Sequence, residues 1–293
     1  MHSRIALATL ALVALAGCSS SPENACSSTG QALSICATGA TVKGVDVYEG
    51  QGTINWTSVK ADGIAFGITR VSDGTGYPDT RFQANWIDMK SAGLVRGTYQ
   101  FFRPEQDPIA QADLLLSMLA KAGGLQSGDL PPMIDIETAG GLSASGVQAS
   151  MTKWINYVEK KIGRKPMIYT AAFMSSYVGT GFSSYPLWVA NYGPSCPTMP
   201  SGWSQWVIWQ YADHGTVAGL SGGEDMDEFN GTLQQLLDFA KGPAAPPPAD
   251  AGAPAPDAGG SGDIDAGART DAGQPVVPPA AKDAGSTIDP CGP

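Results

Sequence analysis

A regular alternation of short apolar segments with helical segments, between residues 42 and 241, constrains the fold more than any other feature of this chain. Most of these segments have the length and the apolar content of a buried strand. Strands that alternate with helices favour a mainly parallel sheet, because a parallel connection needs a crossover. The expected strands span residues 42–48, 63–70, 94–102, 131–137, 166–170, 186–190, 206–211 and 224–229.

The expected helices become sparser toward the end of this region. Ser143 can cap a helix that ends before Gly163, whereas the later strands leave no room for full helices between them. A region of about 200 residues is within the range of one barrel. We therefore expect an α/β fold, a TIM-like barrel of eight strands with a reduced helix set, over residues 42–241. The expected helices span residues 79–91, 107–121, 143–162 and 232–241, after a helical turn at 55–61.

The two ends of the chain differ from this region in composition. Residues 1–18 predict a lipoprotein signal peptide, because a short apolar run precedes Leu-Ala-Gly-Cys, which resembles a lipobox with Cys18 as the lipidated residue. An ordinary cleaved signal with an incidental cysteine is the alternative. Residues 19–41 are expected to be a linker, and residues 242–293 a disordered tail rich in Pro, Ala, Asp and Gly. We expect an exported lipoprotein, anchored to a membrane through Cys18 on the periplasmic or outer side of the cell envelope.

The remaining cysteines are even in number if Cys18 carries lipid. They are Cys26, Cys36, Cys196 and Cys291, which allow three disulfide connectivities in an exported protein. Cys26 with Cys36 is the simplest local pairing, but the sequence does not decide among the three connectivities.

Composition excludes several classes of function. The net charge is −10 and the domain has no basic stripe, which argues against nucleic acid as a partner. His2 lies in the signal and His214 is the only other histidine, so zinc sites and Ser-His-Asp hydrolases are disfavoured. No glycine-rich phosphate loop follows a strand. We expect no cofactor and no metal, a monomeric protein, and carboxylates as the available catalysts.

Four carboxylates are expected to meet at one end of the barrel. Asp135 and Glu137 are two residues apart on an expected strand, so both point to the same side, about 6–7 Å apart along the chain. Asp46 lies near the end of the first strand, and Asp225 lies on the eighth, which closure of the barrel places beside the first. Active sites of such barrels lie at the C-terminal ends of the strands.

This set of carboxylates suits the cleavage of a glycosidic bond, which needs a proton donor and a carboxylate. Structural salt bridges would require basic partners, and only Arg70 and Arg103 lie at other strand ends. A neutral acid at working pH requires a raised pKa, and Glu137, close to the other three carboxylates, would have that setting.

Aromatic residues at the strand ends can supply the rest of a sugar site. Aromatic faces pack on the apolar faces of sugar rings, while polar tips bond to hydroxyl groups. Core packing is the alternative for any single ring, but a saccharide groove explains the group better. The candidate substrate-binding residues are Tyr99, Phe101, Tyr169, Trp188, Tyr192, Trp209 and Arg70.

Eight segments that cover residues 43–241 in order carry a specific resemblance. They are GVDVYEGQGTINW, FGITRVSDGTGYPD, GLVRGTYQFFRP, PPMIDIE, PMIYT, PLWVANY, WVIWQY and DMDEFNG. Together they resemble the glycoside hydrolase family 25 lysozymes, bacterial-type N-acetylmuramidases. Three places differ from the family pattern: Gln100 replaces a histidine, Arg70 and Asp73 replace a Lys and a Glu, and Asp227 replaces an asparagine.

The resemblance implies a (β/α)5(β)3 barrel and a peptidoglycan partner. The implied reaction is cleavage of the β-1,4 bond between N-acetylmuramic acid and N-acetylglucosamine with retention, with Glu137 as general acid. Asp46, Asp135 and Asp225 would form the acidic remainder of the site. Either an enzyme carboxylate or the substrate's acetamido group attacks the anomeric carbon, and in the second case Asp135 would orient that group.

Two other functions are weighed against this one. A non-catalytic barrel could bind glycan without cutting it, although a binder gains nothing from clustering four like charges. A hydrolase of another N-acetylated polymer, such as chitin, is the third hypothesis.

Overall fold

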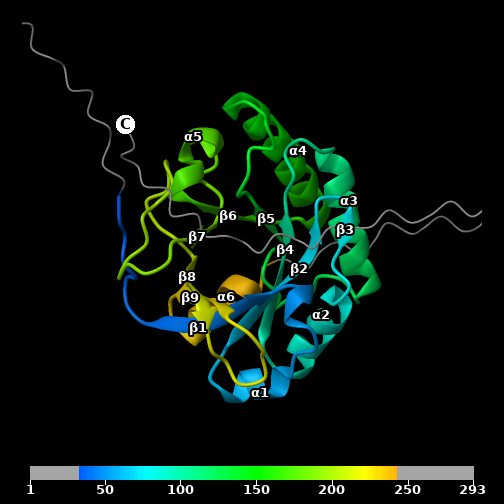
Figure 1. Ribbon diagram of the computed structural model, residues 1–293, viewed down its shortest axis with the longest axis vertical. Helices are drawn as coiled ribbons and strands as arrows, with labels where there is room; N and C mark the ends of the chain where they lie inside the picture. The colour runs from blue at the N-terminus through cyan, green and yellow to red at the C-terminus, as the bar shows by residue number, and fades with distance from the viewer. Residues whose placement is uncertain (1–32, 243–293) are drawn as a thin grey trace, which may run out of the picture. The chain divides into compact units, whose positions relative to one another are not determined.

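The strands of the protein form one sheet that closes on itself. The computed structural model describes residues 33–242, and β1 pairs with both β2 and β9, which closes the barrel (Figure 1). The order is β1-β9-β8-β7-β6-β5-β4-β2, with β3 added to the end of β2 as a hairpin. The strands are β1 (Thr41–Val47), β2 (Phe66–Asp73), β3 (Tyr77–Pro78), β4 (Val95–Phe101), β5 (Met133–Asp135), β6 (Met167–Ala171), β7 (Leu187–Ala190), β8 (Ile208–Gly215) and β9 (Glu224–Asn230).

The helices lie outside this sheet, and α2, α3 and α4 cover β2, β4 and β5 (Figure 1). In the described part of the chain, no helix separates β7 from β8 or β8 from β9. The prediction of a TIM-like (β/α)5(β)3 barrel is therefore confirmed. The helices are α1 (Trp56–Ala61), α2 (Phe82–Ser91), α3 (Pro108–Lys121), α4 (Ala144–Ile162), α5 (Ser175–Val178) and α6 (Leu233–Ala240), with 3-10 turns η1 (Glu49–Gln51) and η2 (Ala172–Met174).

Local capping sets the ends of α4 where the sequence predicts them. The Ser143 side chain accepts a hydrogen bond from the Gly146 amide, and Gly163 ends the helix with φ 73°. Strand β5 is shorter than the predicted 131–137. Pro131 and Pro132 have no N–H to donate to a strand ladder, so pairing begins at Met133.

Strand direction matters for the site. Strand β9 runs antiparallel to both of its neighbours, whereas the other barrel strands pair in parallel. Its N-terminal end, which carries Asp225, therefore lies at the same mouth as the C-terminal ends of the other strands.

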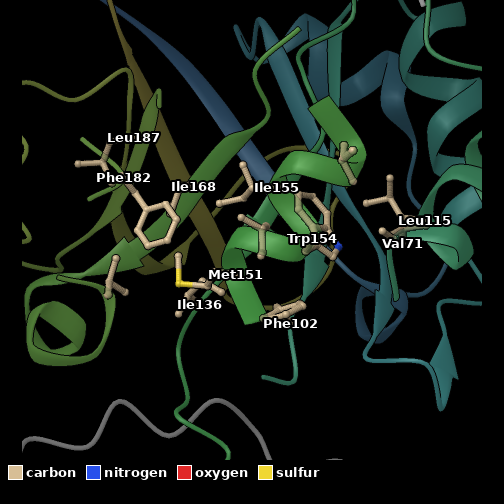
Figure 2. Packing of buried hydrophobic residues seen from close by; sticks show 14 of the residues in the cluster. Val71, Phe102, Leu115, Ile136, Met151, Trp154, Ile155, Ile168, Phe182 and Leu187 are labelled. Carbon is tan, nitrogen blue, oxygen red and sulfur yellow. The ribbon is translucent and has the colours of Figure 1, made fainter. Parts of the chain in front are cut away.

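The side chains alternate between two cores along each strand. Those that point inward, including Phe66, Met133 and Trp188, fill the barrel. Those that point outward pack beneath the helices (Figure 2). This outer cluster includes Val71, Phe102, Leu115, Ile136, Met151, Trp154, Ile155, Ile168, Phe182 and Leu187.

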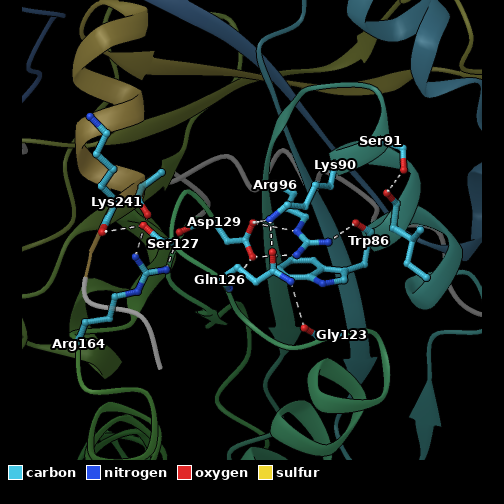
Figure 3. A network of polar contacts seen from close by, with 12 residues as sticks. Trp86, Lys90, Ser91, Arg96, Gly123, Gln126, Ser127, Asp129, Arg164 and Lys241 are labelled. Atoms are coloured by element: carbon cyan, nitrogen blue, oxygen red, sulfur yellow. Dashed lines mark hydrogen bonds and ion pairs between the residues drawn. The ribbon is translucent and has the colours of Figure 1, made fainter. Parts of the chain in front are cut away.

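A buried ion pair joins the elements at the opposite end from this mouth (Figure 3). Arg96, near the start of β4, donates from Nε and Nη2 to both carboxylate oxygens of Asp129, at 2.9 and 3.0 Å. Its Nη1 donates to the Trp86 carbonyl oxygen at 2.8 Å, and its guanidinium lies 4.0 Å from the Trp86 ring centroid. Lys90 lies 3.7 Å from the same carboxylate, so the pair joins α2 and β4 to the segment before β5.

The segment that precedes β1 packs on the barrel, although the sequence predicts it to be linker. Ser34 forms a bridge with Thr198, and the Trp206 indole donates to the Ile35 carbonyl oxygen at 2.7 Å. This places Cys36 beside Cys196, with which it forms a disulfide. The local Cys26–Cys36 pairing is therefore wrong, because tertiary contacts bring together two cysteines that are 160 positions apart.

The predicted signal peptide, the lipidation site at Cys18 and all but the first residue of the tail predicted at 242–293 lie outside the described residues. Within residues 33–242, none of the helices combines the length and the apolar character that a transmembrane span requires.

Candidate active site

The structure brings the predicted carboxylates to the mouth of the barrel. Asp46 on β1 lies directly opposite Asp225 on β9 in the strand register. Asp135 ends β5, between Phe101 on β4 and Tyr169 on β6. Asp46 and Asp135 are both only 3% exposed. The charges of Asp225 and Asp135 both raise the pKa of Asp46, so the three groups act on one another electrostatically.

Glu137 stands just beyond the end of β5 and is half-buried. Burial is the main cause of the raised pKa of the Tyr169 phenol, and the Glu137 charge is the next. The Glu137 charge is also among the causes, after burial, that raise the pKa of the Tyr192 phenol. Glu137 therefore lies on the side of the mouth formed by β5 and β6 and the segment after β7, and it is less enclosed than Asp135.

A glutamine that sequence reasoning missed connects the carboxylates to the phenols. Gln210 on β8 donates from Nε2 to Asp46 at 2.7 Å, and its Oε1 accepts hydrogen bonds from the hydroxyls of Tyr169 and Tyr192, both at 2.7 Å. Both the nitrogen and the oxygen of this buried side-chain amide therefore form hydrogen bonds. The signal that could have found it is a polar residue at an inward position of the predicted strand 206–211.

A fifth carboxylate, Asp227, was noted in the sequence only as a departure from the family pattern. It is 0% exposed, and it accepts a hydrogen bond from the Trp188 indole at 2.8 Å. Burial is the main reason that the pKa of Asp46 lies well above its usual value, and the charges of Asp225 and Asp227 add to it. The hydrogen bond from Gln210 acts in the opposite direction.

Two of the predicted sugar-binding rings belong to the core. Trp188 is 1% exposed and packs edge-on against Tyr99 and Tyr169, with ring centroids 5.9 and 4.4 Å apart, so it forms the floor of the mouth. Trp209 is buried in the outer cluster, where it packs against Trp206 and donates to a backbone carbonyl. Both rings are therefore largely buried, and direct contact of either ring with a sugar stays a prediction.

The other predicted contacts lie at the mouth with different exposure. Tyr192 is the most accessible, at 41% exposed, and its hydroxyl is fixed by Gln210. Phe101 is half-buried, and the Arg103 guanidinium lies 4.4 Å from its ring centroid. Tyr99 and Tyr169 are buried along most of their length.

Arg70 is held at the rim by acidic and aromatic neighbours. Its guanidinium lies 4.6 Å from the Tyr48 ring centroid, and its nitrogens lie 3.4 Å from Asp79 and 3.9 Å from Glu49. Its charge is therefore balanced by these residues.

One of the three departures from the family pattern lies outside the mouth. Gln100 points into the helix layer, where it donates to the Ser72 hydroxyl and the Gln111 carbonyl oxygen and accepts from the Trp154 indole. It therefore connects β4 to β2, α3 and α4.

Within residues 33–242 no group of three or more His, Cys, Asp or Glu side chains has an arrangement suited to a metal ion. Several carboxylates with neutral phenols around them, at the mouth of a barrel, are an arrangement suited to acid-catalysed cleavage of a glycosidic bond.

Comparison with known proteins identifies the family. The family model of glycosyl hydrolases family 25 matches residues 45–220. Lysozyme M1 of Streptomyces globisporus is 39% identical over 218 residues, which cover 69% of this chain and 72% of that protein. An N,O-diacetylmuramidase of Chalaropsis is 34% identical over 69% of this chain and 100% of its own length. The protein belongs to glycosyl hydrolase family 25 and is an enzyme of the lysozyme type.

Solved structures agree with this assignment. A bacterial lysozyme from Streptomyces coelicolor superposes with a TM-score of 0.64 at 35% identity, over 69% of this chain and 98% of that chain. A family 25 lysozyme from Aspergillus fumigatus gives a TM-score of 0.62 at 35% identity, over 69% of this chain and 100% of that chain.

Proposed function

We propose that the protein is a peptidoglycan hydrolase that cleaves the β-1,4 bond between N-acetylmuramic acid and N-acetylglucosamine, with retention of configuration. One observation carries the proposal: Asp46 and Asp225 face each other in the strand register, while Asp135 and Glu137 follow one another at the end of β5. The names of its relatives, a lysozyme and N,O-diacetylmuramidases, support the same bond.

Asp135 at the end of β5 and Glu137 just beyond it are suited to different steps. Glu137 is half-buried, so it can reach a bound glycan and give its proton to the leaving oxygen. Asp135 is almost fully enclosed between β4 and β6, which holds its carboxylate in one place. A fixed carboxylate near the anomeric carbon can orient the substrate's acetamido group or attack the carbon itself.

Tyr192 is the best candidate for direct contact with the sugar. Its ring is accessible, and the hydrogen bond to Gln210 holds its hydroxyl in place. Its pKa lies far above the usual range because of burial first and the charge of Asp225 second, so the hydroxyl stays neutral at physiological pH. Phe101 and the tips of Tyr99 and Tyr169 complete the surface that we assign to substrate.

Digestion of purified peptidoglycan tests the reaction. We expect new reducing ends of N-acetylmuramic acid by mass spectrometry, and a β-anomer at the earliest times by NMR. Chitin oligomers serve as the parallel substrate. Binding to peptidoglycan without release at any pH from about 4 to 8 would favour a glycan-binding barrel, and release from chitin alone would favour the third hypothesis.

We also propose that the protein is exported and lipid-anchored through Cys18. The motif Leu-Ala-Gly-Cys and the Cys36–Cys196 disulfide support this location, because disulfides persist in oxidising compartments outside the cytosol.

Replacing Cys18 with Ala is expected to move the protein from the membrane fraction to the soluble fraction, because it removes the acylated thiol. The measurement is cell fractionation with immunoblotting, together with incorporation of a labelled fatty acid. Cys291→Ala is the matched control and should remain in the membrane fraction. A Cys18→Ala protein that stays in the membrane would contradict the anchor.

A further inference from the structure

Asp227 is a buried acid on β9, two residues after Asp225 at the mouth of the barrel. Its side chain is completely buried, and one carboxylate oxygen accepts the hydrogen bond from Trp188. The other oxygen, Oδ2, accepts no hydrogen bond from an N–H or hydroxyl group within residues 33–242. An ionised carboxylate with one oxygen in this condition is strongly disfavoured, because burial removes its water and nothing replaces it.

A second acid, Asp46, lies beside Asp227. The Asp46 carboxyl lies within hydrogen-bonding reach of it, on a strand that pairs directly with β9. Asp46 itself is 3% exposed and already accepts from Gln210. Among the ion pairs of residues 33–242, none involves a lysine or arginine with either acid. Two buried carboxyl groups in contact cannot both be ionised under these conditions.

We propose that Asp46 and Asp227 hold one proton between them, and that Asp227 is a positioning residue that keeps Asp46 in place beneath the reacting sugar. The acid of one residue donates to the carboxylate of the other, so the pair carries a single negative charge. Gln210 and Trp188 hold the two outer ends of the pair. The inference deepens the proposed function, since Asp46 belongs to the same acidic site, but the proton can be measured without any activity.

The surroundings of Asp46 and Asp227 favour retention of the shared proton, because they are buried and their charged neighbours at the mouth are negative. Burial raises the pKa of both acids well above the usual value, and the charge of Asp225 raises both further. Asp135 on β5 acts on Asp46 in the same direction. The charge of Arg70 on β2 is directed to Asp79 and Glu49. The remaining titratable groups are phenols with raised pKa values, and they stay neutral: Tyr99, Tyr169 and Tyr192.

Loss of the shared proton is expected to set the upper pH limit of activity. Loss of the proton would leave two ionised carboxylates in contact, and their repulsion would move Asp46 away from Gln210. Because Gln210 also holds Tyr169 and Tyr192, the disturbance would reach the surface that contacts substrate. An asparagine at 227 would donate a permanent N–H to Asp46 and accept from Trp188, so it would remove the titration and keep the contacts.

Infrared spectroscopy tests the proton directly. In protein labelled with carboxyl-13C aspartate at pH 7, we expect a band of a neutral carboxylic acid that the double variant Asp46→Asn/Asp227→Asn lacks. Asp88→Asn, at an exposed position of α2, is the control and should keep the band. Identical spectra for the wild type and the double variant would overturn the proposal.

Kinetics test the positioning role. In Asp227→Asn, the fall of kcat/KM at alkaline pH should move to a higher pH by about one unit. At the acidic end of the pH range, kcat should change less than about threefold. A structural role alone would lower activity by the same factor at every pH, and that result, or an unmoved limb, would contradict the assignment. If the enzyme proves inactive on peptidoglycan while the infrared band is present, the proposed reaction fails and the shared proton stands.

Discussion

Replacing Glu137 with Gln is expected to lower kcat for peptidoglycan cleavage by about 10²–10⁴-fold, with KM little changed. Glutamine has the size of glutamate but has no proton to give to the leaving oxygen. The loss should fall on kcat, because protonation of that oxygen develops in the transition state and contributes little to binding of the ground state. The measurement is the initial rate of reducing-end release across a range of substrate concentrations.

A substrate that needs no proton separates the role of Glu137 from that of Asp135. With an aryl glycoside whose phenol leaves easily, the loss in Glu137→Gln should shrink, whereas Asp135→Asn should remain as impaired as on peptidoglycan. Glu228→Gln is the matched control, because Glu228 lies on β9 next to inward-pointing Asp227 and so faces the outer side. A Glu137→Gln enzyme that keeps more than about a tenth of the wild-type kcat would show that the proton comes from elsewhere.

The fold was predictable because its signals are local. The Ser143 cap and the Gly163 stop are each encoded within a few residues, and the structure has them where the pattern predicts. The apolar strands are also encoded locally, although several of their ends differ from the predicted ones. The same locality places Asp46, Asp135 and Asp225 at strand ends, where closure of the barrel collects them. Strand direction is different. The apolar pattern of β9 is the same in either direction, so its antiparallel course required the pairing itself.

The side chains of the site were harder to assign, because two neighbours on a strand face opposite layers. The aromatic ring makes Trp209 a candidate in the sequence, but Trp209 points outward, while the adjacent Gln210 points inward and contacts Asp46. Depth in the barrel is also not encoded by local pattern: Trp188 faces inward and is only 1% exposed. The disulfide between Cys36 and Cys196 depends on a strand-like contact between distant segments, which no local spacing encodes.

Replacing Arg96 with Met is expected to lower the free energy of unfolding by about 3–5 kcal/mol, because it removes one partner of a buried ion pair. Asp129 is 2% exposed and accepts two hydrogen bonds from the guanidinium. After the change it keeps the Gln126 amide and Lys90, whose nitrogen is 3.7 Å away, and that cannot replace a bidentate contact. The measurement is equilibrium unfolding in urea.

Two further variants show whether the unpaired, buried charge of Asp129 causes the loss of stability. The double variant Arg96→Met/Asp129→Leu should recover part of the lost stability, since removing both charges leaves neither one buried alone. Lys241→Met breaks an exposed contact with Asp238 and should leave the unfolding transition unchanged. Because Arg96 lies at the opposite end of the barrel from Glu137, kcat at a temperature where the variant is folded should match the wild type. A double variant less stable than Arg96→Met alone would assign the loss to packing against Trp86 instead.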